Sequence, residues 1–455
     1  MVQNPRWDED ESREIGVSLT PPETVGKLQT ALHTKAKAAP DYRFYALYDK
    51  LYRADVLRHA FHRCLANGGA AGVDGETFEQ ILEGDLDAWL AALAQELRDQ
   101  TYQARAVRRV LIPKPDGKQS RPLGIPCIRD RIAQMAAVLV LEPIFEADLQ
   151  PEQYGYRPNR GALDAVEEVE ALIRAGYREV VDADLSGYFD SIPHAELMKS
   201  LSRRISDGRL LRLLKMWLEM AVEETDKRGN RRRTTHNKDE GRGTPQGAPI
   251  SPLLSNIYMR RFLLGWKTQG RDRALKTRIV NYADDFVICC WTDAEPAMAR
   301  LRRMMPRLKL TINETKTRKC RLPDESFDFL GYSFGRNYDR RTGRAYLGAS
   351  PSRKKVQSLG RRISEQTSRR WLYLSEEEVV KQLNMQLIGW GNYFRIGTVS
   401  RAYAWINNHA VSRLRQWLCA KYDLRGQGYT RFPNRYLRQE LGLVELRRVR
   451  ASASP

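Results

Sequence analysis

Residues 278–290 read RIVNYADDFVICC, and the rest of the chain is organised around this stretch. Two apolar, β-prone runs flank a short polar tip, a pattern that predicts a hairpin carrying the adjacent carboxylates Asp284 and Asp285. Adjacent carboxylates on a tight turn repel each other, so a buried or half-buried pair favours bound cations. Asp is also common in ordinary solvated turns. A third carboxylate on another strand would decide between these interpretations.

A β-branched run upstream contains that third carboxylate. Residues 179–190 read EVVDADLSGYFD, and the run leads directly into Asp184. Two strands, one ending at Asp184 and one turning at the Asp-Asp pair, would bring three carboxylates together. Such a cluster can hold two Mg²⁺ ions for phosphoryl transfer. Asp182 and Asp190 are competing carboxylates, and because side chains alternate along a strand, Asp182 shares the face of Asp184. Spacing alone does not choose between them.

Five short motifs occur in the order in which reverse transcriptases carry them. They are Asp184 with Phe189, GTPQG at 243–247, YADD at 282–285, LTINETKT at 310–317 and FLGY at 329–332. Further on, QLNMQLIGWGNYFR at 382–395 resembles the thumb, or maturase, signature of group II intron-encoded proteins. Over roughly residues 41–445, the sequence resembles a group II intron-encoded reverse transcriptase/maturase of the bacterial type without an endonuclease domain.

The resemblance implies an α/β (α+β) fold, a right-hand polymerase with palm and fingers followed by an α-helical thumb. Residues 70–77, AAGVDGET, resemble the Gly-rich loop of the family's N-terminal extension, although alone they would indicate only a turn between helices. The expected parts are a loosely ordered lead-in at 1–40, the N-terminal extension and start of the fingers at 41–100, fingers and palm at 101–345, the thumb (maturase, or X) domain at 346–445, and a tail at 446–455.

The resemblance also implies roles for individual residues. Asp184, Asp284 and Asp285, with the backbone carbonyl of Leu185, would hold two Mg²⁺ ions, and Lys316 would protonate the leaving pyrophosphate. The expected nucleotide-binding residues are Arg108, Lys114, Lys118 and Arg121 of the fingers, Phe189 as a steric gate against a 2′ hydroxyl, and Gln246 beside the nascent base pair. The expected nucleic-acid contacts are Tyr282, Gly331, Arg353, Lys354 and Lys355.

The fingers cations lie in residues 108–126, RRVLIPKPDGKQSRPLGIP. The Asp-Gly pair at 116–117 predicts a hairpin tip between two strands that carry cations on both arms. Cations projected from a hairpin can hold a triphosphate and neutralise charge that develops during phosphoryl transfer. Lys114 and Arg121 are the favoured pair, but this turn has one residue more than the common family form, so the phosphate-facing cation stays open. An exposed basic hairpin is the alternative.

The composition favours a polyanionic partner. Lys and Arg number 76 against 56 acidic residues, which gives a net charge of +20 and a pI near 9.7. Residues 351–455 hold 20 basic and 7 acidic residues, so +13 of this charge lies in the last quarter. The sequence has no apolar run of membrane-spanning length and no signal-peptide pattern at its start. Six scattered cysteines without a C-x-x-C pair argue for a reducing compartment, here the bacterial cytoplasm.

The partners that the resemblance implies are group II intron RNA, an RNA template with a DNA primer, target DNA and dNTPs. We expect an RNA-directed DNA polymerase that copies RNA into DNA and binds its intron RNA to assist splicing and mobility. Two alternatives stay open. One is an RNA-binding splicing factor whose polymerase is secondary, and the other is a freestanding domesticated reverse transcriptase in DNA repair or phage defence.

Overall fold

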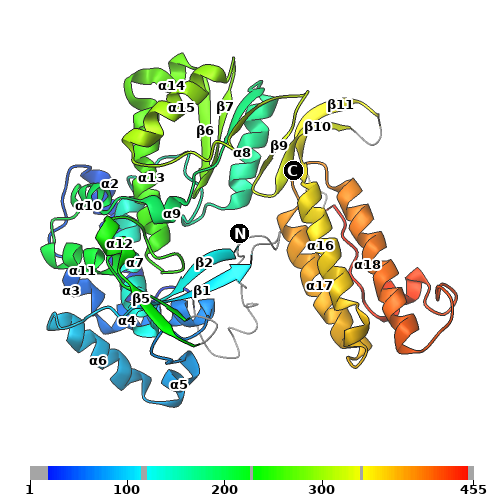
Figure 1. The fold of residues 1–455 in the computed structure, drawn as a ribbon, viewed down its shortest axis with the longest axis horizontal. Helices are drawn as coiled ribbons and strands as arrows, with labels where there is room; N and C mark the ends of the chain where they lie inside the picture. The colour runs from blue at the N-terminus through cyan, green and yellow to red at the C-terminus, as the bar shows by residue number, and fades with distance from the viewer. Residues whose placement is uncertain (1–18, 114–119, 226–228, 339–341, 449–455) are drawn as a thin grey trace. The chain divides into compact units, whose positions relative to one another are not determined.

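The computed structural model describes residues 19–113, 120–225, 229–338 and 342–448. This part of the chain is a mixed α/β structure (Figure 1). It forms two compact units that each combine segments distant in sequence. The first unit contains the chain up to Asn159, Leu185–Arg271 and Arg300–Asn313, and the second contains Arg160–Asp184, Asp272–Ala299 and the chain from Glu314 onward. This division groups the chain differently from the domain boundaries predicted above, which stay predictions.

The helical core of the first unit is α7 (Ile128–Glu146), which is buried along nearly its whole length. Its apolar residues are not confined to one face, as expected of a helix inside a protein, and α2 (Glu23–Ala38) and α4 (Ala54–Asn67) both pack on α7. The other helices of this unit are α3 (Tyr48–Leu51), α5 (Phe78–Glu83), α6 (Leu86–Arg98), α9 (Tyr188–Ser191), α10 (His194–Ser202), α11 (Gly208–Leu218), α12 (His236–Glu240), α13 (Ser251–Lys267) and the 3-10 turn η1 (Thr268–Gly270). Helices α14 (Arg271–Ala274) and α15 (Glu295–Arg307) contain the boundaries between the units.

Helix α2 corrects the expected loose lead-in at residues 1–40. Val25, Leu32 and Ala36 lie on one face of this helix and are buried, and the side-chain amide of Gln29 donates to the carbonyl of Leu139 at 3.1 Å. The mixed charge that suggested a loose segment lies on the exposed faces, whereas the spaced apolar positions decide the structure. Residues 1–18 lie outside the described residues.

The sheet of the first unit has the order β2-β1-β4-β5. Strand β1 (Val107–Pro113) pairs antiparallel with β2 (Ser120–Ile125), which confirms the predicted fingers hairpin. Its tip at 114–119 lies outside the described residues. Strand β1 also pairs in parallel with β4 (Val222–Thr225), which forms a second antiparallel hairpin with β5 (Arg231–Thr234). That hairpin precedes the GTPQG motif in the sequence.

The second unit contains a sheet of order β6-β7-β3-β8, with helix α8 (Ala162–Arg174) packed on β6 and β7 (Figure 1). All pairings in it are antiparallel. Cys289 and Cys290 are completely buried in it. The strands are β3 (Glu179–Ala183), β6 (Thr277–Tyr282), β7 (Asp285–Cys290) and β8 (Arg318–Arg321).

The rest of the second unit confirms the predicted change to helices near residue 350. A small antiparallel sheet, β11-β10-β9, precedes these helices, and α16 and α18 pack against each other. The elements are β9 (Phe327–Phe329), β10 (Tyr332–Tyr338), β11 (Ala345–Pro351), α16 (Arg353–Gln366), η2 (Arg369–Trp371), α17 (Glu376–Tyr393), α18 (Ser400–Lys421) and the π-helical turn η3 (Tyr436–Glu440).

Two expectations about the chain's chemistry can be compared with the structure. All six cysteines are buried and unpaired, which agrees with the prediction that they form no disulfide framework. Within the described ranges, no helix is long and apolar enough to cross a bilayer.

Candidate active site

The predicted hairpin at residues 278–290 is present as β6 and β7. Tyr282 pairs with Asp285, so the turn between the strands consists of Ala283 and Asp284. Ala283 is buried and has a φ of +58°, in the left-handed region that residues with a side chain rarely adopt. The two carboxylates therefore lie at a tight, strained tip, which agrees with the sequence prediction.

The third carboxylate lies beside this tip, as predicted. Strand β3 pairs antiparallel with β7, and the last pair in the register is Ala183 with Phe286. Asp184 directly follows the end of β3, and Asp285 is the first residue of β7. The same sheet edge therefore holds the carboxylate after β3 and both carboxylates of the β6–β7 turn. Throughout, we call Asp184, Asp284 and Asp285 the carboxylate cluster.

The electrostatics show that these carboxylates influence one another. Burial, together with the neighbouring charges of Asp284 and Asp184, raises the pKa of Asp285 to about 7. Like charges disfavour ionisation of a neighbouring carboxyl, and burial has the same sign for an acid. A strongly perturbed carboxyl with specific charged neighbours is typical of functional sites.

Two cations from the segment entering β8 distinguish the competing carboxylates. The Lys316 ammonium lies 3.3 Å from Asp184, and the Arg318 guanidinium lies 3.6 Å from Asp182. Arg318 also faces Asp182 directly in the β3–β8 pairing. Asp182 thus has a structural partner on its own sheet, whereas Asp184 lies beyond the strand with Asp285. Lys316, predicted to act near the triphosphate, is brought into the carboxylate cluster.

Thr317, between these two cations, fixes the backbone at the end of β3. The Asp184 amide donates to the Thr317 hydroxyl at 3.1 Å, and Thr317 itself is buried. The sequence analysis missed this role, although the alternation of Lys316, Thr317 and Arg318 along a strand is a signal that could have indicated it. Thr317 thus holds the backbone of Asp184. Its neighbours Lys316 and Arg318 place cations beside Asp184 and Asp182.

Asn281 is a second residue that the sequence analysis missed. It is completely buried in β6, and its side-chain amide donates to the carbonyl of Ala283 at 2.8 Å and to that of Asp285 at 3.4 Å. A short amide side chain that bonds to backbone two residues ahead is a typical turn-forming contact. Asn281 therefore holds the strained tip that carries Asp284 and Asp285.

The donor chemistry fits a hard divalent cation, because carboxylate oxygens are the ligands that Mg²⁺ prefers and their repulsion would be relieved by a cation. Within the described part of the chain, however, no three His, Cys, Asp or Glu side chains are already arranged as a metal-binding group. Lys316 instead provides the positive charge beside Asp184. A cation would therefore require these side chains to rearrange.

The remaining predicted residues of the second unit lie on β6 and around the start of α16. Tyr282 is half-buried at the end of β6. Arg353, Lys354 and Lys355 are all exposed in the first turn of α16, where cations oppose the helix dipole. Gly331 has a φ of +85° and lies against the Lys355 side chain, because an added Cβ would come within 3.3 Å of it.

In the first unit, the predicted residues have well-defined local surroundings. Phe189 is buried and in edge contact with Tyr188, and the Gln246 amide donates to Asp190 at 2.9 Å. The Leu185 backbone forms an isolated antiparallel bridge with Ile312. These contacts leave the proposed steric-gate, base-pair and metal-ligand roles as predictions.

Among the fingers cations, Arg108 has a structural partner. Its guanidinium donates twice to the carbonyl of Ala71, at 2.9 and 2.6 Å, and so holds the Gly-rich loop. Arg131 also donates to this loop, at the carbonyl of Ala70. Arg121 lies in β2, and Lys114 and Lys118 lie outside the described residues. Arg108 is thus a less suitable triphosphate ligand than the sequence suggested.

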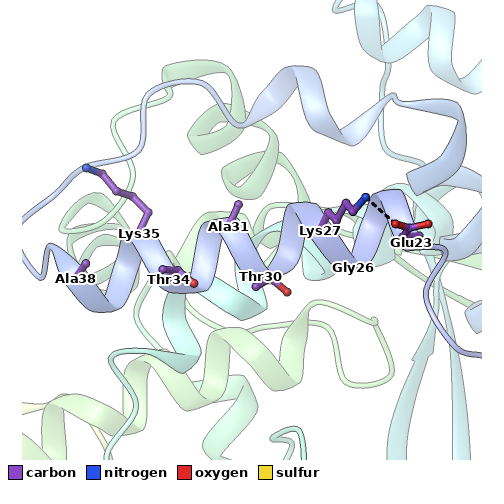
Figure 2. A pocket seen from close by; sticks show the side chains of 8 residues that line it. All are labelled: Glu23, Gly26, Lys27, Thr30, Ala31, Thr34, Lys35 and Ala38. Carbon is purple, nitrogen blue, oxygen red and sulfur yellow. Dashed lines mark ion pairs between the residues drawn. The ribbon is translucent and has the colours of Figure 1, made fainter.

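A shallow pocket follows the outer face of α2, as Figure 2 shows. Small side chains form most of its wall, and its Glu23 and Lys27 are paired at 2.6 Å. This lining contains a single carboxylate, Glu23, and therefore no group of carboxylates. The carboxylate cluster, rather than this pocket, is therefore the candidate active site. The pocket residues are Glu23, Gly26, Lys27, Thr30, Ala31, Thr34, Lys35 and Ala38.

Comparisons with known families and proteins identify the family of this chain. Residues 112–334 match the family described as reverse transcriptase (RNA-dependent DNA polymerase), and residues 356–436 match the group II intron, maturase-specific domain. The chain is 33% identical over 353 residues to Protein YkfC of Escherichia coli, which covers 70% of this chain and 90% of YkfC. It is also 33% identical over 244 residues to the group II intron-encoded protein LtrA of Lactococcus lactis, which covers 52% of this chain and 38% of LtrA.

Among solved structures, a chain of a partial Cas6-RT-Cas1–Cas2 complex is similar at 24% identity, covering 58% of this chain and 41% of that chain. Its TM-score is 0.33, which is too low to establish a shared fold. The family matches and the similarity along most of YkfC establish the relationship instead. This chain belongs to the group II intron reverse transcriptases, RNA-directed DNA polymerases that carry a maturase domain.

Proposed function

We propose that this chain copies RNA into DNA by extending a primer 3′ hydroxyl with deoxynucleoside triphosphates. The observation that carries this proposal is the carboxylate cluster, in which Asp184 and Asp285 meet at one sheet edge beside the Asp284 turn. In the reaction, the primer 3′ oxygen forms a bond to the α-phosphorus, and the bond from that phosphorus to the pyrophosphate oxygen breaks. Positioning and electrostatic stabilisation account for most of the catalysis in such transfers.

Asp184, Asp284 and Asp285, with the Leu185 carbonyl, would hold two Mg²⁺ ions in this proposal. Such ions lower the pKa of the attacking hydroxyl and neutralise charge on the triphosphate. Lys316 would leave Asp184 when the carboxylate takes a cation, and its ammonium would then be available to protonate pyrophosphate. The raised pKa of Asp285 supports this assignment, because the cluster carries repulsion that a cation relieves.

Substrate selection would fall to residues of the first unit. Phe189 would exclude a 2′ hydroxyl, Gln246 would contact the nascent base pair, and cations of the β1–β2 hairpin would contact the triphosphate. Because the Arg108 guanidinium already holds the Gly-rich loop, we favour Lys114, Lys118 or Arg121 for the contact with the triphosphate. Tyr282, Gly331 and the cations at the start of α16 would contact the primer–template duplex.

We further propose that the helical region binds group II intron RNA and assists its splicing and its insertion into target DNA. The maturase-domain match and the +13 charge of residues 351–455 support this role. A reducing bacterial cytoplasm is the compartment that suits six unpaired cysteines. The main competing function is a splicing factor with a secondary polymerase, which the same maturase-domain match also favours.

The test compares wild-type protein with Asp284→Asn and with Asp324→Asn, an exposed-carboxylate control from the same unit. Each protein is assayed for RNA-templated extension of a DNA primer and for splicing of the RNA transcribed from its own locus. We expect Asp284→Asn to lose extension and to keep splicing, while Asp324→Asn keeps both. Extension by Asp284→Asn at the wild-type rate would falsify the polymerase assignment. Splicing without any wild-type extension would support the splicing-factor alternative.

A further inference from the structure

The turn between β9 and β10 is the second strained hairpin tip in the unit that carries the carboxylate cluster. Phe329 pairs with Tyr332, so the turn consists of Leu330 and Gly331, with φ values of +51° and +85°. Leu330 is 4% exposed and has a large side chain in a conformation that favours glycine. Such a tip persists only when surrounding contacts hold it. Strand β9 also contacts β7, which carries Asp285.

Tyr393, the last residue of α17, holds this tip directly. Its hydroxyl donates to the Leu330 carbonyl at 2.7 Å, across 63 residues of sequence. In return, the hydroxyl of the completely buried Tyr332 donates to the Tyr393 carbonyl at 2.5 Å. Carbonyls in the last turn of a helix lack intrahelical partners, so Tyr332 caps α17 while Tyr393 fixes the turn. We call these two reciprocal bonds the tyrosine clamp.

Packing around the tyrosine clamp limits how the turn can move. The Phe394 ring lies 5.1 Å from the Tyr332 ring, and it would contact a Cβ added at Gly331. Burial raises the pKa of the Tyr393 hydroxyl, and Tyr332, Tyr282 and Asp285 raise it further. Tyr393 of the helical region therefore contacts the β9–β10 turn, and its pKa responds to groups of the β6–β7 hairpin.

We propose that Tyr393 is a positioning residue for polymerisation, whose hydroxyl fixes the Leu330–Gly331 turn so that the turn presents the primer end to the carboxylate cluster. This inference rests on the proposed polymerase function. It also means that a helix of the maturase-type region takes part in DNA synthesis through the turn, in addition to any role in RNA binding. Plain aromatic packing of α17 is the competing explanation, because Trp390, Phe394 and Tyr403 pack in the same place.

Tyr403 offers a matched control for the competing explanation. Its hydroxyl donates to the Phe394 carbonyl at 2.8 Å and to the Gly391 carbonyl at 3.2 Å, at the same end of α17. Tyr403→Phe therefore removes one buried hydroxyl from the end of this helix without changing the turn. Tyr393→Phe removes one hydroxyl and leaves the Leu330 carbonyl without its partner. Both substitutions preserve the aromatic ring.

The experiment measures kcat and KM for primer–template and for dNTP in full-length wild type, Tyr393→Phe and Tyr403→Phe, with Tm as the folding control. We expect Tyr393→Phe to lower kcat/KM for primer–template about tenfold, with the KM for dNTP unchanged, and Tyr403→Phe to stay within about twofold. Equal effects of the two substitutions, or a loss of kcat alone with unchanged KM values, would overturn the proposal.

Tyr332→Phe keeps the proposal testable if Tyr393→Phe does not fold. It removes the other half of the tyrosine clamp, and we expect the same preferential loss against primer–template. If neither variant differs from Tyr403→Phe, the positioning role is wrong. Failure of the underlying function is distinguishable: a wild type that extends no primer overturns both proposals, whereas an active wild type, an inactive Asp284→Asn and an unaffected Tyr393→Phe overturn only the role of Tyr393.

Discussion

The β6–β7 and β9–β10 hairpins belong to the same unit and share an unusual tip, yet they are held in different ways. Each places a non-glycine residue in the left-handed region, Ala283 in one and Leu330 in the other. The first tip is fixed by Asn281, two residues away, and the second by Tyr393, 63 residues away. The bonds from Asn281 make the β6–β7 tip nearly self-contained, whereas the β9–β10 turn depends on the helical region. The difference predicts that the roles proposed for the two tips, chemistry and primer placement, can fail separately.

The largest expected effect tests whether primer extension needs Asp184, the carboxylate after β3, in addition to the Asp284–Asp285 tip. Asp184→Asn should reduce primer extension by at least about a hundredfold, because it removes a carboxylate that would hold the metal ions neutralising the charge on the reacting phosphoryl group. Asp182→Asn, on the same face but paired with Arg318, should reduce it less than about tenfold. Rapid-quench measurement of single-nucleotide incorporation compares the two. Equal losses would show that β3 contributes both carboxylates to the reaction.

Asp130, a buried carboxylate of the first unit, shows how burial changes a pKa without repulsion from a neighbouring carboxylate. Asp130 is completely buried, accepts bonds from the Tyr102 hydroxyl and the Arg105 amide, and has its pKa raised by burial to about 6. Because the folded state holds this proton more tightly than the unfolded state does, Asp130 stabilises the fold most below about pH 4. That contribution decreases as the pH rises through about 6.

Denaturant unfolding of wild type and Asp130→Asn between pH 4 and pH 7 checks this sign. The free energy of unfolding of wild type minus that of the variant should fall by up to about 3 kcal/mol as the pH rises, because the variant has no proton to lose. The difference isolates Asp130 from the other titrating groups. A difference that is constant with pH would show that burial does not raise this pKa.

The bonds by which Asn281 holds the β6–β7 tip can be removed without changing the carboxylates. Asn281→Leu keeps the approximate size of the side chain but leaves the Ala283 carbonyl unpaired, which should cost about 1–3 kcal/mol of stability. Because the tip carries both carboxylates, kcat should also fall at least about tenfold. Asn407 is a matched control, since its buried amide donates to the Leu446 carbonyl at 3.0 Å, away from the turn.

We expect Asn407→Leu to lose comparable stability while retaining the kcat of its folded fraction. Calorimetry and active-site titration together give the two quantities. A kcat loss in Asn407→Leu equal to that in Asn281→Leu would mean that general loosening of the unit, rather than loss of the Asn281 bonds, slows the reaction.

The smallest expected effect is a test of independence. If the two hairpins are held separately, the effects of Asn281→Leu and Tyr393→Phe on kcat/KM should add within about 0.5 kcal/mol. Tyr332→Phe and Tyr393→Phe should not add, because both act on the tyrosine clamp. Strong coupling between Asn281 and Tyr393 would contradict the comparison, since the two hairpins would then behave as one element.

The same comparison explains what the sequence could predict. The β6–β7 hairpin, the end of β3 and the two fingers strands follow from alternation and turn residues, which act over a few positions. Asn281 and Thr317 were missed because a buried amide or hydroxyl in a strand looks the same whether or not it bonds to backbone. Local composition also misled at 1–40, where three buried positions of α2 outweigh the surrounding charge.

The tyrosine clamp could not be predicted from the sequence for a different physical reason. It joins positions more than sixty residues apart, and only packing of α17 against the β9–β10 turn brings Tyr393 and Leu330 together. Arg108 is a similar case, because a cation that fits a triphosphate equally fits the carbonyl of the Gly-rich loop. The residue type permits both roles, and the distant partner decides between them.

The measurement that tests the carboxylate cluster most directly is binding of Mn²⁺, a paramagnetic substitute for Mg²⁺, followed by electron paramagnetic resonance. The protein is titrated in complex with a primer–template that ends in a dideoxynucleotide and with the next correct dNTP, so that no reaction occurs. We predict two bound ions in wild type and in Asp182→Asn, with at least one lost in Asp184→Asn and in Asp285→Asn. Two bound ions in all four proteins would contradict the assignment of the cluster as the metal site.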